Sequence, residues 1–221
     1  PGGASVPAAR QGSGLVSLQG LMLLLELGRT RAAAGEGFLM ALEEPEVHLP
    51  PATQQQLVQR VQALSTQTFI TTHSPVIAAM ADPASVLILR NDHGQLTAKP
   101  FLTDVLLPDA PNWKRKFFQQ NRVDVLSALL HPAILVPEGR ADFQLLKSIL
   151  RPLMLTEGWI SSLPRAFGLE VGVVPTDDAK VVETHALLAG VHQCVCCLVD
   201  GDAAGQGYVE QLKATQPPQL R

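Results

Sequence analysis

Aromatic side chains are scarce in this sequence of 221 residues, where seven phenylalanines, two tryptophans and one tyrosine amount to 5%. Charged residues are also few, at 17%, whereas 46% of the residues are hydrophobic. Disordered chains show the opposite balance, so this composition excludes disorder as the general state of the chain. The length suffices for one large domain or two small ones with buried cores.

An excess of basic residues is missing as well. The 17 Lys and Arg residues stand against 20 Asp and Glu, which gives a formal net charge of -3. Proteins that coat nucleic acid are usually basic, so this balance counts mildly against DNA as a partner. The acidic balance is a weaker argument against DNA if the acids are concentrated in metal sites, because a bound cation reverses the local charge.

Long hydrophobic runs and signal-peptide patterns are absent too. The longest apolar run lies at residues 21–25, far short of a membrane span. The cysteines are confined to Cys194, Cys196 and Cys197, and no second cluster offers a zinc half-site. We therefore expect reduced core thiols in a cytoplasmic protein without membrane association.

Short apolar runs alternate with amphipathic segments along most of the chain. Strands are predicted to begin at residues 38, 68, 85, 133, 169 and 194, and helices are predicted over residues 15–29, 52–64, 75–81, 141–150, 179–190 and 207–214. Apolar strands that alternate with helices indicate an α/β fold with a parallel sheet covered on both faces.

A mixed stretch interrupts this alternation and contains the basic-aromatic sequence WKRKFF at residues 113–118. We interpret residues 93–131 as a linker, and WKRKFF as a solvated helix face or, less favoured, a DNA contact. This interpretation predicts one domain over residues 1–92 and a second over residues 132–221.

Two glutamates follow the first predicted strand, in FLMALEEPEVHLPP. Glu43 and Glu44 stand at the carboxyl end of that strand, where ligands bind in open α/β sheets. Nucleotide hydrolysis needs one acid near Mg²⁺ and another group that orients the attacking water. The next strand, in TFITTHSP, ends near His73, which is placed to reach a γ-phosphate. The alternative is that the acids only cap a turn.

These two motifs resemble the Walker B segment and the switch histidine of ABC-type ATPases. The form EEPE-x-HL-x-P is similar to that of the OLD (overcoming lysogenisation defect) family. The resemblance implies that Glu43 is the magnesium-side acid, Glu44 the catalytic acid and His73 the switch histidine. Pro50 departs from the pattern, because a histidine is expected there before Pro51.

The earlier segment GSGLVS is similar to the signature loop of these ATPases, which holds ATP across a dimer. The resemblance implies that Gly12, Ser13 and Gly14 bind nucleotide and that the protein is a homodimer through its ATPase part. An ordinary glycine loop is the alternative. The sequence holds no G-x4-GK[ST] motif, so we expect the phosphate cradle upstream of Pro1. The chain alone is therefore not expected to hydrolyse ATP.

Four carboxylates follow two of the later strands. Glu138 ends one strand, and Asp142 lies four residues later, a helical spacing that turns it back to the same face. Asp200 and Asp202 end another strand, with Gly201 between them. If the two strands are neighbours in a parallel sheet, the four acids converge on one edge. Such oxygen donors suit Mg²⁺ or Mn²⁺, and two ions can clamp a phosphodiester. Exposed turn acids are the alternative.

A strand followed by EG, and later a strand followed by D-x-D-x-x-G, resembles the Toprim domain of topoisomerases, primases and OLD nucleases. The resemblance implies that Glu138, Asp200 and Asp202 are the three core acids. Asp142 matches the helical acid that the OLD group adds for a second metal. Pro137 departs from the pattern, because relatives usually have a β-former there.

The Toprim part looks truncated at its C-terminus, because one more strand is expected after the predicted helix at residues 207–214. The catalytic basic residue therefore stays unassigned. Asp178, in the sequence PTDDAK, is expected to be a helix N-cap rather than a ligand. Lys180 is an outside candidate for a phosphate contact.

The order of the two motif sets resembles OLD-family ATP-dependent endonucleases over almost the whole chain. The resemblance implies a metal-dependent DNA endonuclease with two Mg²⁺ or Mn²⁺ ions, regulated by ATP. One alternative is a Toprim part that serves as a non-catalytic docking module on an ATPase dimerisation platform, against which the four acids count. A topoisomerase is a poorer alternative, because the only tyrosine is Tyr208, on a helix past the acids.

Overall fold

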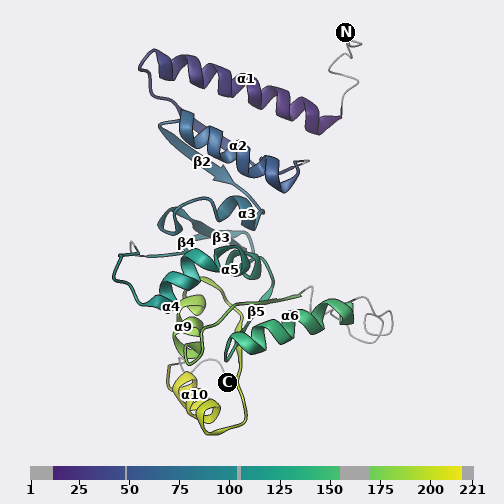
Figure 1. The fold of residues 1–221 in the computed structure, drawn as a ribbon, viewed down its shortest axis with the longest axis vertical. Coiled ribbons are helices and arrows are strands. Elements are labelled where there is room, and N and C mark those ends of the chain that lie inside the picture. The colour runs from purple at the N-terminus through teal and green to yellow at the C-terminus, as the bar shows by residue number, and fades with distance from the viewer. Residues whose placement is uncertain (1–11, 48, 104–105, 155–169, 216–221) are drawn as a thin grey trace. The chain divides into compact units, whose positions relative to one another are not determined.

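The computed structural model describes residues 12–47, 49–103, 106–154 and 170–215. The chain divides into two compact units, Pro1–Met80 and Ala81–Arg221, and Figure 1 shows their helices and strands. Both units are mixed α/β structures with small parallel sheets. None of the helices in the described ranges combines the length and hydrophobicity that crossing a membrane requires.

The first unit is built around two parallel strands and the helix between them. Its elements are α1 (Ser13–Ala33), β1 (Leu39–Glu43), α2 (Pro51–Leu64), β2 (Gln67–Thr71) and α3 (Pro75–Ala78). α2 starts with a proline at its first position, where the missing N–H is tolerated. The parallel pairing aligns Glu43 with Thr71, so both strands end at the same edge.

The core of the first unit lies between the two long helices and one face of the sheet. The apolar positions Leu57 and Val61 of α2 are buried, as their helical spacing predicts, and they pack with Leu25 and Met40. β1 exposes alternate residues, and Leu39 is 60% exposed. The prediction of a strand covered on both faces is therefore wrong for the described part of this unit.

The second unit combines a hairpin, a helical segment and a three-stranded parallel sheet. Its elements are β3 (Leu87–Asp92), β4 (Gln95–Pro100), α4 (Asn112–Arg115), a π-helix (Lys116–Gln120), α5 (Arg122–Leu129), β5 (Ala133–Pro137), α6 (Arg140–Met154), β6 (Val171–Val173), α9 (Val181–Val191), β7 (Val195–Leu198) and α10 (Ala203–Thr215). β3 and β4 pair antiparallel, and the parallel sheet has the order β6-β5-β7.

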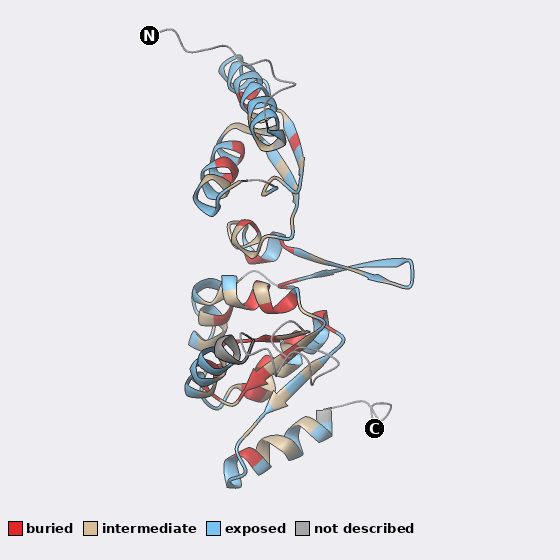
Figure 2. Ribbon diagram, turned by 90° about the vertical axis from the view of Figure 1, so that its right-hand side faces the viewer, coloured by how far each residue is buried: buried red, intermediate tan, exposed pale blue. Residues whose placement is uncertain are grey.

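The central strand of the parallel sheet is the best buried. Ile134 and Val136 of β5 are fully buried, and Figure 2 shows buried residues concentrated around this strand. β5 pairs with β6 on one side and β7 on the other, all parallel. The strands that precede the two acidic motifs are therefore direct neighbours, as the sequence analysis requires for a shared edge.

Residues 93–131 are part of the second unit rather than a linker. Phe101, Phe117 and Phe118 are at most 3% exposed, and the ring of Phe118 lies 5.0 Å from that of Phe101 and 5.1 Å from that of Phe117, between centroids. The interpretation of WKRKFF as a solvated face is wrong, because its two phenylalanines bury large apolar surfaces. The unit boundary accordingly lies at Met80–Ala81.

The cysteines do not form part of the core. Cys194 and Cys196 are exposed and Cys197 is partly buried, and all three are free thiols. The expectation of core thiols is wrong because β7 is an edge strand of the sheet, with alternate residues exposed. Burial raises the pKa of the Cys197 thiol to about 11.

Candidate functional site

The acids of the EEPE sequence lie where β1 ends. Glu43 is the last residue of β1 and is exposed. Glu44 follows with a φ of 42°, a left-handed conformation that is uncommon for a residue other than glycine. Its backbone N–H donates to the carbonyl oxygen of Thr71 over 2.8 Å, which extends the pairing of β1 with β2 by one bond. The chain thus turns sharply at the sheet edge, directly after the first acid.

The predicted pair of catalytic acid and switch histidine is brought together. The Nε2 atom of His73 lies 3.3 Å from Oε1 of Glu44, and both side chains are substantially exposed. β2 ends at Thr71, so the histidine follows the second strand as Glu44 follows the first. The two strand ends therefore present an acid and an imidazole side by side at one edge.

Glu46, which the sequence analysis did not single out, connects the same two loops. Its Oε1 atom accepts hydrogen bonds from Oγ1 of Thr72 at 2.7 Å and from the N–H groups of His73 at 2.7 Å and Ser74 at 3.1 Å. The sequence does show a third acid in EEPE, two residues after Glu44. Spacing alone does not identify the groups that donate hydrogen bonds to Glu46.

The glycine loop predicted to bind nucleotide forms the start of a helix. Gly12 is the N-cap residue of α1, and its carbonyl oxygen accepts hydrogen bonds from Leu15 and Val16. Ser13 and Gly14 belong to the first turn. The helix N-terminus is confirmed, while nucleotide binding by this loop stays a prediction.

The acids of the second unit gather at the carboxyl edge of its parallel sheet. The backbone N–H of Asp200, after β7, donates to Oε2 of Glu138, after β5, over 2.8 Å. Asp142, in the first turn of α6, accepts from the N–H of Gly139 over 3.2 Å. Asp202 directly precedes α10, and its carboxylate accepts from the N–H of Gly205 over 2.8 Å. The four predicted acids thus lie on the two neighbouring turns.

A fifth acid reaches this edge from the third strand. Oδ1 of Asp178, in the segment after β6, accepts from the backbone N–H of Arg140 over 3.2 Å. A Cβ atom on Gly139 would stand 2.5 Å from that oxygen, so a larger residue there would displace the Asp178 side chain. The prediction of Asp178 as a helix N-cap is wrong, because Lys180 precedes α9. Lys180 pairs instead with Glu183, at 2.5 Å.

The donor chemistry of this edge fits a hard divalent cation, because carboxylate oxygens are preferred ligands of Mg²⁺ and Mn²⁺. The side chains themselves do not converge. Within the described ranges, no group of three or more His, Cys, Asp or Glu side chains is arranged to hold one metal ion. Glu138, Asp142 and Asp202 each have one carboxylate oxygen that accepts a backbone N–H. The edge therefore has suitable donors in suitable positions, but not a closed metal site.

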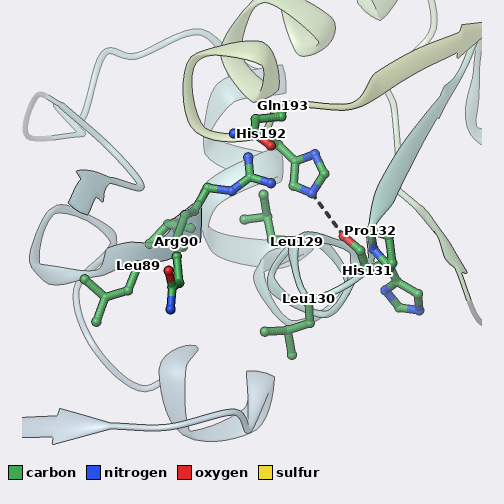
Figure 3. Close-up of a pocket in the computed structure, with 10 residues that line it drawn as sticks. Leu89, Arg90, Leu129, Leu130, His131, Pro132, His192 and Gln193 are labelled. Carbon is green, nitrogen blue, oxygen red and sulfur yellow. Dashed lines mark hydrogen bonds between the residues drawn. The ribbon is translucent and has the colours of Figure 1, made fainter. Parts of the chain in front are cut away.

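A separate pocket in the second unit lies between β3, the end of α5 and residues 192–193, with a volume of about 300 Å³ (Figure 3). None of the predicted site residues lines it. His192, on its wall, contacts the carbonyl oxygen of His131 through Nε2 at 3.0 Å, and the N–H of Cys194 donates to its Nδ1. Burial lowers the pKa of His192, which favours the neutral form of the ring. This histidine is a structural bridge.

Comparison with known protein families finds a match over the segment that contains Glu44 and His73. Residues 2–78 match the family model of the AAA ATPase domain, a range that includes both Glu44 and His73. Among curated proteins, none matches the chain. The match supports an AAA/ABC-type ATPase region at residues 2–78.

Proposed function

We propose that this chain belongs to an ATP-dependent endonuclease of the OLD type. Its ATPase region would regulate a metal-dependent, Toprim-like site that hydrolyses DNA phosphodiester bonds. The observation that supports this most is the contact between the ends of β5 and β7, where Asp200 N–H donates to Glu138 over 2.8 Å. Two acids that begin separate motifs are thereby neighbours at the edge where α/β sheets bind ligands.

The residues that would hold Mg²⁺ or Mn²⁺ are Glu138, Asp142, Asp200 and Asp202. Two such ions, when bound, would stabilise the attacking and leaving oxygens of the phosphodiester. β5 and β7 fix the first acid of each motif, while α6 and the turn before α10 supply the second. DNA is the proposed substrate because the order of the two motif sets resembles that of OLD-family endonucleases. Bound cations would neutralise these acids, so that a polyanion could approach them.

In the ATPase region, Glu44 would orient the water that attacks the γ-phosphate, and His73 would contact that phosphate. The residues Gly12, Ser13 and Gly14 would bind the nucleotide of a partner copy at the N-terminus of α1. Such a shared nucleotide makes a homodimer the proposed assembly. Residues 1–221 include no phosphate-binding P-loop sequence, so the proposed activity requires the intact protein.

The deciding experiment compares the intact wild-type protein with Asp200→Ala in a plasmid-nicking assay with Mg²⁺ or Mn²⁺. We expect Asp200→Ala to lose nicking by about 100-fold or more, as removal of a transition-state contact does. ATP hydrolysis should persist. Asp109→Asn, an exposed acid of the same unit, is the matched control and should cut normally. A fully active Asp200→Ala protein would overturn the nuclease assignment.

A second candidate function is protein docking by a non-catalytic Toprim-like unit. The observation that favours it is that Glu138, Asp142 and Asp202 each already use one carboxylate oxygen to accept a backbone N–H group. Titration of the wild-type protein with Mn²⁺ distinguishes the two. Binding that Asp200→Ala weakens supports the nuclease, whereas no binding together with no nicking supports docking.

A further inference from the structure

The carboxylate of Glu46 is committed to the loop that contains the switch histidine. Its three donors, Thr72 Oγ1 and the N–H groups of His73 and Ser74, all belong to the three residues after β2. Hydrogen bonds to a charged carboxylate are about twice as strong as bonds between neutral groups. The other oxygen, Oε2, is buried and has no hydrogen-bond partner within the described part of the chain. A single oxygen therefore accepts hydrogen bonds from all three residues of this loop.

The same loop is fixed from a second side by α2. Oγ of Ser74 donates to Oε1 of Gln54 over 3.0 Å, and Nε2 of Gln54 donates to the carbonyl oxygen of Leu49 over 2.8 Å. Ser74 N–H also lies 2.9 Å from Oγ1 of Thr72. These bonds restrain Ser74, whereas His73 is restrained, within the described residues, by Glu44 and Glu46.

Those two restraints act on different parts of the histidine. Glu46 holds its backbone N–H, at 2.7 Å, and Glu44 lies 3.3 Å from its imidazole. Both acids belong to one short loop, whose direction is set by the left-handed conformation of Glu44. If the hydrogen bond from His73 N–H to Glu46 were lost, the exposed contact between the side chains of His73 and Glu44 would have to restrain the histidine. Exposed contacts of this kind are weak.

We infer that Glu46 is a positioning residue for ATP hydrolysis, which holds the His73 backbone so that the imidazole stays beside Glu44. The inference rests on the proposed ATPase function and adds a residue to it. Glu46 would contact neither the attacking water nor the phosphate. It acts through His73, so its effect should appear in the chemical step rather than in nucleotide binding.

The test uses Glu46→Ala and Glu46→Gln in the intact protein. Glu46→Ala should lower kcat for ATP hydrolysis by about tenfold or more, because small displacements of catalytic groups are costly. KM for ATP should stay within about twofold of wild type, as loss of an interaction made only in the transition state requires. Glu46→Gln keeps an acceptor oxygen and should restore kcat to within about threefold of wild type. Glu36→Ala, an exposed acid of the same unit, is the control and should behave as wild type.

Amide hydrogen exchange in the chain of 221 residues supplies a readout independent of activity. Glu46→Ala should accelerate exchange at His73 and Ser74, and leave exchange at Val61 in α2 unchanged. Unchanged exchange at His73 and Ser74 would overturn the inference, as would equal loss of kcat in the Ala and Gln variants. An active protein insensitive to Glu46→Ala would overturn the inference alone. A wild-type protein that does not hydrolyse ATP would overturn the proposed ATPase function itself.

Discussion

Gly205 occupies a position in α10 where only a hydrogen atom fits. A Cβ atom there would stand 1.9 Å from the carbonyl oxygen of Asp200, well inside a normal van der Waals contact. We expect Gly205→Ala to lower the free energy of unfolding of the second unit by about 1–3 kcal/mol, the usual cost of overpacking. Urea unfolding followed by circular dichroism measures this change.

Gly207 offers the matched control for that substitution, because it lies on the same helix and has nothing within 4 Å of its would-be Cβ. Gly207→Ala should stabilise the protein slightly, by up to about 1 kcal/mol, as alanine does in helices. If the Gly205→Ala and Gly207→Ala variants were equally stable, the turn at Asp200 would be able to move and make room for a side chain at position 205. The glycine of D-x-D-x-x-G would then have no packing role.

The buried His192 and the partly buried His185 predict how the stability of the second unit depends on pH. Burial lowers the pKa of both His185 and His192 below 6.5 in the folded state. The unfolded chain therefore binds protons first as the pH falls, so stability present above about pH 6.5 is lost on acidification. We expect the free energy of unfolding to fall between pH 7 and pH 5, and to fall less steeply in His192→Gln. Parallel slopes for wild type and His192→Gln in urea titrations would contradict this.

The contrast between Glu44 and Glu46 shows what the sequence could and could not predict at this scale. Glu43 and Glu44 follow one predicted strand and His73 follows the next, so parallel pairing of the two strands was enough to bring Glu44 and His73 to one edge. Glu46 lies farther along its loop, and its contacts depend on a left-handed turn at Glu44 that the residue type does not favour. Strand ends are therefore predictable, whereas the side-chain partners inside the following loop are not.

The helical segment before β5 makes a testable contribution to the core. Phe118, in the π-helix, is fully buried and meets Phe101 and Phe117 edge-on. We expect Phe118→Ala to destabilise the second unit by about 3–5 kcal/mol, the range for buried aromatic residues. Leu96→Ala, at a position 67% exposed in β4, should change stability by no more than about 0.5 kcal/mol.

Thermal unfolding of the two variants checks this expectation. A loss for Phe118→Ala as small as that for Leu96→Ala would restore the linker interpretation of residues 93–131. The sequence did not reveal this packing because the aromatic partners come from two segments, one after β4 and one in the π-helix. Periodicity reports the face of a single helix, and residues drawn from two different segments have no common period.

For the whole molecule, the boundary between the units makes a prediction about autonomous folding. Residues 81–221 should fold alone, whereas residues 132–221, the predicted Toprim domain, should not. The shorter piece lacks α5, whose Ala128 lies so close to β6 that a Cβ on Gly172 would stand 2.5 Å from its Cα. It also lacks the phenylalanine cluster.

Circular dichroism and thermal melts of both pieces provide the measurement. The longer piece should unfold in a single cooperative transition, and the shorter piece should show none. A cooperative transition of residues 132–221 at the same temperature would show that the helical segment is dispensable. The boundary inferred from composition, within residues 93–131, would then describe the protein better.

The hairpin of β3 and β4 also affects whether the purified second unit associates with itself. Leu87, Leu89 and Leu96 are each more than half exposed, and β4 is exposed along its whole length (Figure 2). The two strands pair only with each other in the described chain, so each leaves an outer edge with unpaired backbone groups. Edges of this kind accept strands from neighbouring molecules. Concentrating residues 81–221 should therefore favour hairpin-to-hairpin association, and a lysine in place of Leu89 should widen the range of concentrations over which the sample stays monodisperse.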